Sequence, residues 1–218
     1  MPNSRPQTPR PFPQQARAIE TRARLIEAGR RAFAEYGHDG VNVERDILGP
    51  ANVQFGSFYH QFNDKTDLLL AVMGAAAVDR TELVMVKGFL HPDVSDLEER
   101  LRLGVGRLFE SFDTEEHAWR VQLQVRESPN PRIRESVIRT REDWIGRLAG
   151  MLTAEGHAGG TAAREAAEIL VALKVGTAAM YLALDAEERS RRRCEIVESV
   201  SRFVIGGVEA LIELTPAT

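Results

Sequence analysis

The chain has a single cysteine, Cys194, so an internal disulfide is excluded and a reducing compartment is expected. Aromatic residues make up only 6% of its 218 residues. No uninterrupted apolar run approaches the roughly 20 residues that a membrane helix needs. The N-terminus has arginine and proline but no apolar segment, so a secretory signal is not expected. We therefore expect a soluble, cytoplasmic protein with no membrane partner.

The sequence also lacks the residue spacings that enzymes and metal sites need. Its five histidines are scattered, and none pairs with a carboxylate or thiolate at the spacing of metal ligands. No glycine-rich loop is suited to cradling a phosphate, and no local pairing of a nucleophile with a base suggests catalysis. We therefore expect neither an enzyme nor a bound cofactor or metal.

An overall excess of positive charge is absent, but one end of the chain is basic. The formal net charge is −4, whereas residues 1–34 carry seven arginines against two glutamates, a balance of +5. Such a distribution suits a protein that meets phosphate with one end only. Residues 1–15 include five prolines and little that can pack, so we expect a disordered basic arm there. An inert tail and a phosphate-contacting arm both fit this composition.

From Gln14 almost to the C-terminus, apolar residues recur at helical spacing, and no stretch alternates as a strand would. Glycine, proline and asparagine clusters interrupt the pattern and divide it into about nine helices. The fold class is therefore predicted to be all-α. The predicted helices cover residues 14–36, 43–49, 54–61, 64–88, 96–112, 115–126, 132–155, 161–184 and 186–213.

Residues 43–61 form two short predicted helices joined by a tight turn, which is the helix-turn-helix arrangement of DNA-binding proteins. The turn needs one left-handed residue, and Asn52 tolerates that conformation better than most residues other than glycine. Gly56 costs about 1 kcal/mol relative to alanine within a helix, which suggests close approach of a neighbouring helix or of DNA. Asp64 and Asp67 have the spacing of a capping box at the start of the next helix.

The second short helix divides its side chains between core and surface. Phe58 and Phe62 are four residues apart, so they share a face and are expected in the core. The remaining side chains suit a DNA groove, because they offer hydrogen-bonding groups for phosphate oxygens and a ring for a thymine methyl. The predicted DNA contacts from this helix are Gln54, Phe55, Ser57, Tyr59 and His60.

Three groups of residues match a known pattern: Thr21-Arg22 with Leu25-Ile26-Glu27-Ala28, Ala32-Phe33 and Tyr36-Gly37; Gly56-Ser57-Phe58-Tyr59-His60 with Phe62; and Asp64-Lys65-Thr66-Asp67-Leu68-Leu69. Together they span residues 20–72 and resemble the DNA-binding domain of TetR-family transcriptional regulators. The resemblance implies that the predicted contacts of the second helix, together with Lys65, meet the operator. It also implies that Arg22 reaches a neighbouring phosphate.

The chain departs from this family's pattern in four places. Residues 43–47 are one residue longer than usual between their apolar anchors. Gly49-Pro50 replaces good helix formers, so the helix is expected to end early or bend there. Gln54 replaces a better capping hydroxyl, and Phe55 replaces a common basic or polar contact. A helical carrier or scaffold that has lost sequence-specific DNA binding is therefore the alternative function.

Beyond about residue 85 the resemblance implies only an architecture: a helical ligand-binding and dimerisation domain whose last two long helices form a four-helix interface between subunits. We therefore expect an arm over 1–15, a helix-turn-helix domain over 16–64 and a larger helical domain over 65–218. The last two helices each carry an apolar stripe that suits either a dimer interface or the core. The stripes are Ala166, Ile169, Leu170, Leu173, Gly176, Thr177, Met180 and Leu184, and Ile196, Val200, Phe203, Val204, Gly207, Val208 and Leu211.

Aromatic and methionine residues of this larger domain are candidates for an effector cavity, although such residues are more often plain core. If they line a cavity, a small hydrophobic or aromatic effector is favoured. The resulting hypothesis is a ligand-responsive repressor that binds a palindromic operator in double-stranded DNA as a homodimer. The candidate cavity residues are Phe109, Phe112, Trp119, Leu123, Trp144, Leu148, Met151, Met180 and Tyr181.

Overall fold

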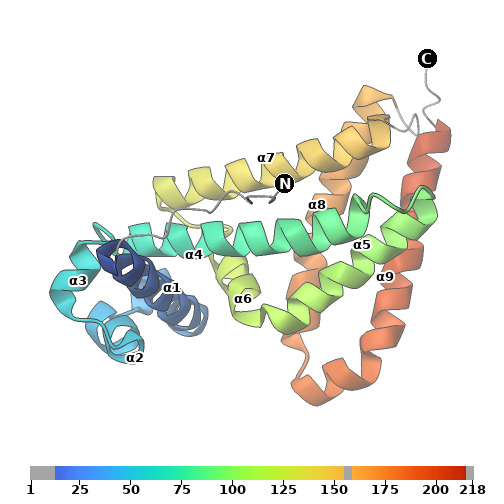
Figure 1. Cartoon of the computed structure of the whole chain (residues 1–218). Helices are drawn as coiled ribbons and strands as arrows, with labels where there is room; N and C mark the ends of the chain where they lie inside the picture. The colour runs from blue at the N-terminus through green and yellow to red at the C-terminus, as the bar shows by residue number, and fades with distance from the viewer. Residues whose placement is uncertain (1–12, 155–158, 215–218) are drawn as a thin grey trace, which may run out of the picture. The chain divides into compact units, whose positions relative to one another are not determined.

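The computed structural model describes residues 13–154 and 159–214, and all regular structure in these ranges is helical (Figure 1). Nine α-helices and two π-helical segments account for it, which confirms the all-α prediction. The chain divides into two compact units, Met1–Val72 and Met73–Thr218. Of the predicted arm, residues 1–12 lie outside the described residues, whereas residues 13–15 already belong to the first helix. Most of the predicted break at 156–160 also lies outside them.

Helix α1, Pro13–Gly40, is interrupted at Gly37, as the turn chemistry of that segment predicts. Gly37 has φ 68° and ψ 171°, a conformation that is essentially restricted to glycine. The buried face of α1 includes Leu25 and Phe33, which pack into the core of the first unit. Gly29 lies so close to α4 that an added Cβ would be 3.0 Å from Leu68 Cδ2. The small residue therefore allows the two helices to approach closely.

The second predicted helix consists of a π-helical segment, η1 (Val43–Leu48), continued by α2 (Gly49–Ala51). The Gly49 N–H donates to Glu44 O, five residues earlier, so this turn holds one residue more than an α-turn. The extra residue noted in the sequence is accommodated there. Pro50 does not end the helix as expected, because it lies in the first turn of α2, where a missing N–H costs little.

The turn that follows has the predicted left-handed residue. Asn52 has φ 50° and ψ 51°, and its N–H donates to Gly49 O at 3.0 Å. Helix α3, Phe55–Tyr59, is shorter than predicted, with Gln54 and His60 as its flanking residues. Helix α4, Lys65–Arg80, begins at the predicted cap, where Asp64 Oδ1 accepts from the N–H of Asp67 at 2.7 Å.

The second unit is built from the last part of α4, from Met73 on, η2 (Thr81–Phe89) and five further α-helices. α5 packs against η2 and α9, and α7 packs along α8 (Figure 1). The approach of α5 to η2 depends on Gly104, since an added Cβ would overlap the Phe89 ring. Asp96 caps α5, because its Oδ1 accepts from the N–H of Glu99 at 2.8 Å. The bounds are α5 Leu97–Thr114, α6 Glu116–Val125, α7 Pro131–Ala154, α8 Gly160–Ala183 and α9 Ala186–Leu214.

Among the described helices, α8 alone is long and apolar enough to cross a membrane by length and composition. Charged residues such as Glu168 and Lys174 interrupt α8, so it is not an uninterrupted apolar run. One face of α8 packs into the core through Ala163, Leu170 and Tyr181, which accounts for much of its apolar composition. A core helix of a soluble protein satisfies the same two criteria, so this finding is weak evidence for a membrane span.

Candidate DNA-binding surface and effector cavity

Helix α3 buries one aromatic face and exposes another. Phe58 is 0% exposed and Phe62 is 4% exposed, so their predicted core positions are confirmed. Phe55 and Tyr59 are each 52% exposed, and their ring centres lie 4.9 Å apart. Large aromatic rings held together on a surface are typical of binding sites. The Tyr59 hydroxyl adds a hydrogen-bonding group to this pair.

The other side chains of α3 leave its outer surface open. Gln54 and His60 are exposed at the two ends of the helix, and Ser57 is half-buried between them. The side chain of Gln54 makes no capping hydrogen bond. A Cβ added to Gly56 would meet nothing within 4 Å. Packing against a neighbouring helix of the same unit therefore does not explain this glycine.

The two predicted basic contacts outside α3 are held by hydrogen bonds within the first unit. Arg22 donates from Nη1 to Gln61 O at 3.2 Å, and its guanidinium lies 4.5 Å from the centre of the Phe62 ring. Lys65 Nζ donates to Asp39 O at 3.3 Å. These contacts fix the ends of α3 and α4 relative to α1. Exposed Arg22 is thus held beside Gln61, after the end of α3, and half-buried Lys65 is held at the start of α4.

Sequence reasoning missed the charged groups at the start of η1. Asn42 Oδ1 accepts from the N–H of Arg45 at 3.0 Å and so caps the segment. The guanidinium of Arg45 donates to both carboxylate oxygens of Asp46, at 2.6 and 3.0 Å, and this pairing is the main cause that lowers the pKa of Asp46. A phosphate would have to compete with Asp46 for Arg45.

Within the described residues, no group of three or more His, Cys, Asp or Glu side chains could hold a metal ion.

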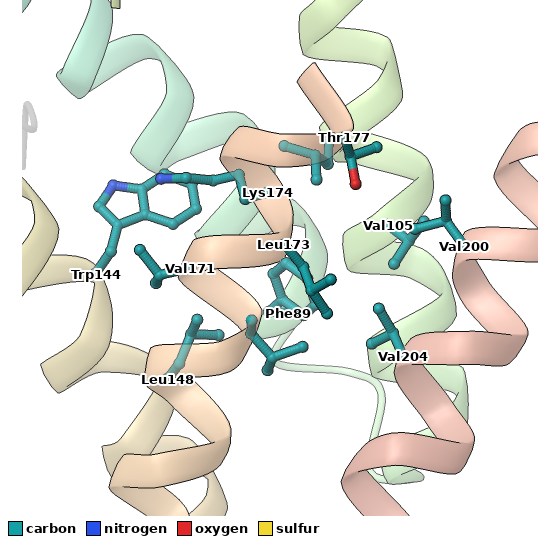
Figure 2. Close-up of a pocket in the computed structure, with 12 residues that line it drawn as sticks. Phe89, Val105, Trp144, Leu148, Val171, Leu173, Lys174, Thr177, Val200 and Val204 are labelled. Atoms are coloured by element: carbon teal, nitrogen blue, oxygen red, sulfur yellow. The ribbon is translucent and has the colours of Figure 1, made fainter. Parts of the chain in front are cut away.

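A small cavity lies in the core of the second unit, between η2, α5, α7, α8 and α9 (Figure 2). Its volume is about 20 Å³, which is room for about one water molecule. Two of the nine predicted cavity residues, Trp144 and Leu148, line it. The lining residues are Phe89, Val105, Leu108, Trp144, Leu148, Leu170, Val171, Leu173, Lys174, Thr177, Val200 and Val204.

Four further candidates form an aromatic cluster in place of a cavity lining. Phe109, Phe112, Trp119 and Tyr181 have neighbouring ring centres 4.8 to 5.8 Å apart and are almost fully buried. The polar atoms of this cluster are bonded: Trp119 Nε1 donates to Ser111 Oγ at 3.1 Å, and the Tyr181 hydroxyl donates to Asp113 Oδ1 at 2.8 Å. The structure therefore places these four rings together as core.

The last three candidates lie in different surroundings. Met151 is buried in the core of the second unit, and Leu123 is partly buried against it. Met180 is 50% exposed, together with Ile169 and Phe203 on the same two helices. Met180 and Phe203 line a surface groove of about 300 Å³ between α8 and α9. The structure thus places Met180 on an exposed apolar surface, outside the cavity.

Lys174 is the cavity residue that sequence reasoning missed. It is 7% exposed, and its Nζ lies 3.6 Å from the centre of the Trp144 ring (Figure 2). Burial, followed by the positive charge of Arg80, lowers the pKa of Lys174 to about 7. A signal was present in the sequence, because Lys174 falls at helical spacing with Leu170, Val171 and Ala178 on the apolar stripe of α8.

Comparison with known sequences relates the first unit to bacterial regulators. The family described as "Bacterial regulatory proteins, tetR family" matches residues 25–72. The HTH-type transcriptional repressor AcnR of Corynebacterium diphtheriae is 32% identical over 93 residues, which is 38% of this chain and 47% of the relative. The match therefore spans about half the length of that curated repressor, so the relation concerns one part of each protein.

Solved structures extend the likeness to nearly the whole chain. A TetR-family transcriptional regulator from Syntrophomonas wolfei is similar with a TM-score of 0.70 and 18% identity, over 87% of this chain and 95% of that one. The regulator FadR from Bacillus subtilis, solved in complex with stearoyl-CoA, is similar with a TM-score of 0.64 and 21% identity, over 87% and 97% of the two chains. At these identities the likeness shows the fold: a helix-turn-helix domain followed by a larger helical domain.

Proposed function

Because this chain belongs to the TetR family of bacterial regulatory proteins through its N-terminal domain, we propose that it is a cytoplasmic transcriptional repressor. It binds operator DNA as a homodimer and releases it when a small molecule binds. The observation that carries this proposal is α3, which buries Phe58 and exposes Phe55 and Tyr59 beside an uncrowded Gly56. A short exposed helix after a tight turn is the element that helix-turn-helix proteins insert into the major groove.

The side chains at this surface have two roles on DNA. Tyr59, His60 and Lys65 offer hydrogen-bond donors that suit phosphate oxygens, and such contacts fix the protein on the duplex without reading its sequence. Arg22 offers a guanidinium at the same surface, where its bond to Gln61 O orients it. Phe55 has no polar group, so its ring reads a thymine methyl in the groove. Gln54 and Ser57 complete the contacts, as the resemblance implied.

A second copy of the chain binds through the exposed apolar surface of α8 and α9. Ile169, Met180 and Phe203 are 48%, 50% and 67% exposed, which is unusual for large apolar side chains of one surface. A twofold dimer with this interface presents two copies of α3, and two copies match the two half-sites of a palindromic operator.

The effector acts through the cavity of the second unit. At about 20 Å³ the cavity admits no molecule much larger than water, so an effector has to shift the side chains around it. A related fold, that of FadR from Bacillus subtilis, was solved with stearoyl-CoA, which supports a ligand with an apolar body. If the effector binds the DNA-incompetent arrangement more tightly, typical coupling of about 1–3 kcal/mol lowers operator affinity.

Fluorescence anisotropy tests the proposal with DNA from upstream of the protein's own gene and a scrambled fragment of equal length. Tight binding to the upstream fragment that weakens with salt is expected, because phosphate contacts release counterions. Equal, weak and salt-insensitive binding to both fragments would favour the carrier or scaffold function instead. Addition of cell extract to the bound complex then provides an assay for the effector.

A further inference from the structure

Lys174 is a buried cation in a mainly apolar part of the second unit. Its ammonium group lies 3.6 Å from the centre of the Trp144 ring and 6.0 Å from that of Trp119. Among the described residues, these two rings are the contacts of its ammonium group. After burial, the charged side chain that lowers its pKa is the cation Arg80, and no carboxylate in the described part of the chain contributes to the shift. A lysine in such surroundings loses hydration without gaining an opposite charge, and its charged form is disfavoured.

Lys174 is one of the residues that line the cavity, so its charge belongs to the lining. Lys174 and Thr177 are three residues apart on α8, so they share a face, and both line the cavity (Figure 2). Leu148 and Val171 lie on the same lining and are apolar. The Lys174 side chain runs towards Trp144 and the Thr177 hydroxyl points away from it, so the ammonium group of Lys174 is the charged group of an otherwise mainly apolar lining (Figure 2). A small number of polar groups in an apolar lining is typical of a small-molecule site.

We propose that this cavity is the effector site and that it takes a compact organic carboxylate, whose oxygens bind Lys174 Nζ while Leu148 and Val171 surround its apolar body. Carboxylate binding is a property of the cavity alone. Only its effect on DNA affinity rests on the proposed function.

The chemistry of the site favours a carboxylate over other small ligands. A carboxylate supplies the missing negative charge and accepts hydrogen bonds from the ammonium group. A neutral alcohol of the same shape leaves the ammonium without an opposite charge. An alkylammonium adds positive charge beside Lys174 and within the field of Arg80.

The size of the cavity also limits the head group. Because the space beside Lys174 amounts to about 20 Å³, only a small head group can be buried there, and the surrounding side chains have to move for its body. A bulky anionic head group would require a larger displacement of these side chains than a carboxylate does. The inferred ligand is therefore a free acid of modest size.

Tryptophan fluorescence reports on this site, because Trp119 and Trp144 are the chain's two tryptophans and both lie within 6.0 Å of Lys174 Nζ. The full-length protein would be titrated with hexanoate, benzoate and decanoate, each compared with its alcohol (1-hexanol, benzyl alcohol and 1-decanol). Lys174→Met removes the charge with little change in side-chain length. The matched control is Lys87→Met, which removes an exposed lysine of η2.

We expect at least one acid to bind the wild type and Lys87→Met about tenfold or more tightly than its alcohol. Lys174→Met should lose this preference and still bind the alcohol, which shows that the cavity has kept its shape. Three results would overturn the proposal: equal binding of acids and alcohols by the wild type, an acid preference that persists in Lys174→Met, or no saturable response to any of the acids.

The titration contains no DNA, so it separates this site from the repressor function. A Lys174-dependent acid response in a protein without selective, salt-sensitive DNA binding would retain the site and reject the repressor. Selective DNA binding without an acid response would retain the repressor and reject the site.

Discussion

Replacement of Lys174 by methionine should stabilise the protein, although it changes a buried side chain of the core. Burial, together with the charge of Arg80, lowers the pKa of Lys174 from 10.5 to about 7. Each pKa unit corresponds to about 1.36 kcal/mol, so keeping this lysine buried costs up to about 5 kcal/mol. Relaxation of the surroundings reduces that figure. We therefore expect Lys174→Met to raise the free energy of unfolding by about 3 kcal/mol at pH 7, or roughly 6–12 °C in Tm.

The pH dependence of this difference has a defined sign. Between pH 7 and 10.5 the unfolded chain binds a proton at Lys174 that the folded chain does not, so wild-type stability rises with pH. Above pH 10.5 Lys174 is neutral in both the folded and the unfolded protein, and the free-energy cost of burying its charge vanishes. Below pH 7 Lys174 is protonated in both the folded and the unfolded protein, and the free-energy cost of burying its charge is constant and largest. The advantage of Lys174→Met should therefore be greatest below pH 7 and should shrink towards pH 10.5.

Urea unfolding followed by far-ultraviolet circular dichroism at several pH values measures this difference directly. Subtraction of the variant's free energy of unfolding from that of the wild type removes the contributions of groups that titrate alike in both proteins. Lys87→Met is the control, because an exposed lysine should leave both the stability and its pH dependence nearly unchanged. A Lys174→Met variant that is less stable than the wild type at pH 7, with a difference independent of pH, would refute the desolvation argument.

Five further substitutions test the DNA-binding surface and the dimer. Gly56→Ala should keep or raise stability by up to about 1 kcal/mol, because its Cβ meets only open space, yet weaken operator binding about tenfold in anisotropy titrations; unchanged affinity would contradict close approach of DNA. Tyr59→Phe and Lys65→Ala should weaken binding to all sequences, whereas Phe55→Ala should change the ranking of operator variants, and an unchanged ranking would exclude Phe55 from base contact. Phe203→Glu should convert the dimer to a monomer in light scattering at equal protein concentration, and a dimer that persists would exclude the surface of α8 and α9.

The local rules of turns and caps predicted much of the helix-turn-helix segment. Asn52 is left-handed, and Asp64 caps α4, because each of these preferences depends on a few neighbouring residues. The π-helical geometry of η1 was not predicted. The sequence showed that a residue was extra, but whether the extra residue ends the helix or widens one turn is decided by the packing of Ile47 and Leu48 in the core.

The cavity was harder to predict than the fold. Phe109 and Trp144 look alike in a sequence, but the first packs against other rings and the second lies beside Lys174. Which of two buried aromatic side chains borders a space depends on how five elements meet, and helical periodicity carries no such information. Lys174 was overlooked because lysine is rarely buried, although its place on an apolar stripe was visible.

The widened turn of η1 also determines how the protein responds when its gene gains or loses a single codon there. Insertion of one residue into an α-helix rotates every following side chain by about 100°, which would turn the buried face of a recognition element outward. In η1 the surplus residue is confined to one widened turn, and Ala51 and Phe58 beyond it are still buried. Deletion of one codon between residues 43 and 48 should therefore shorten the segment and leave α3 in place.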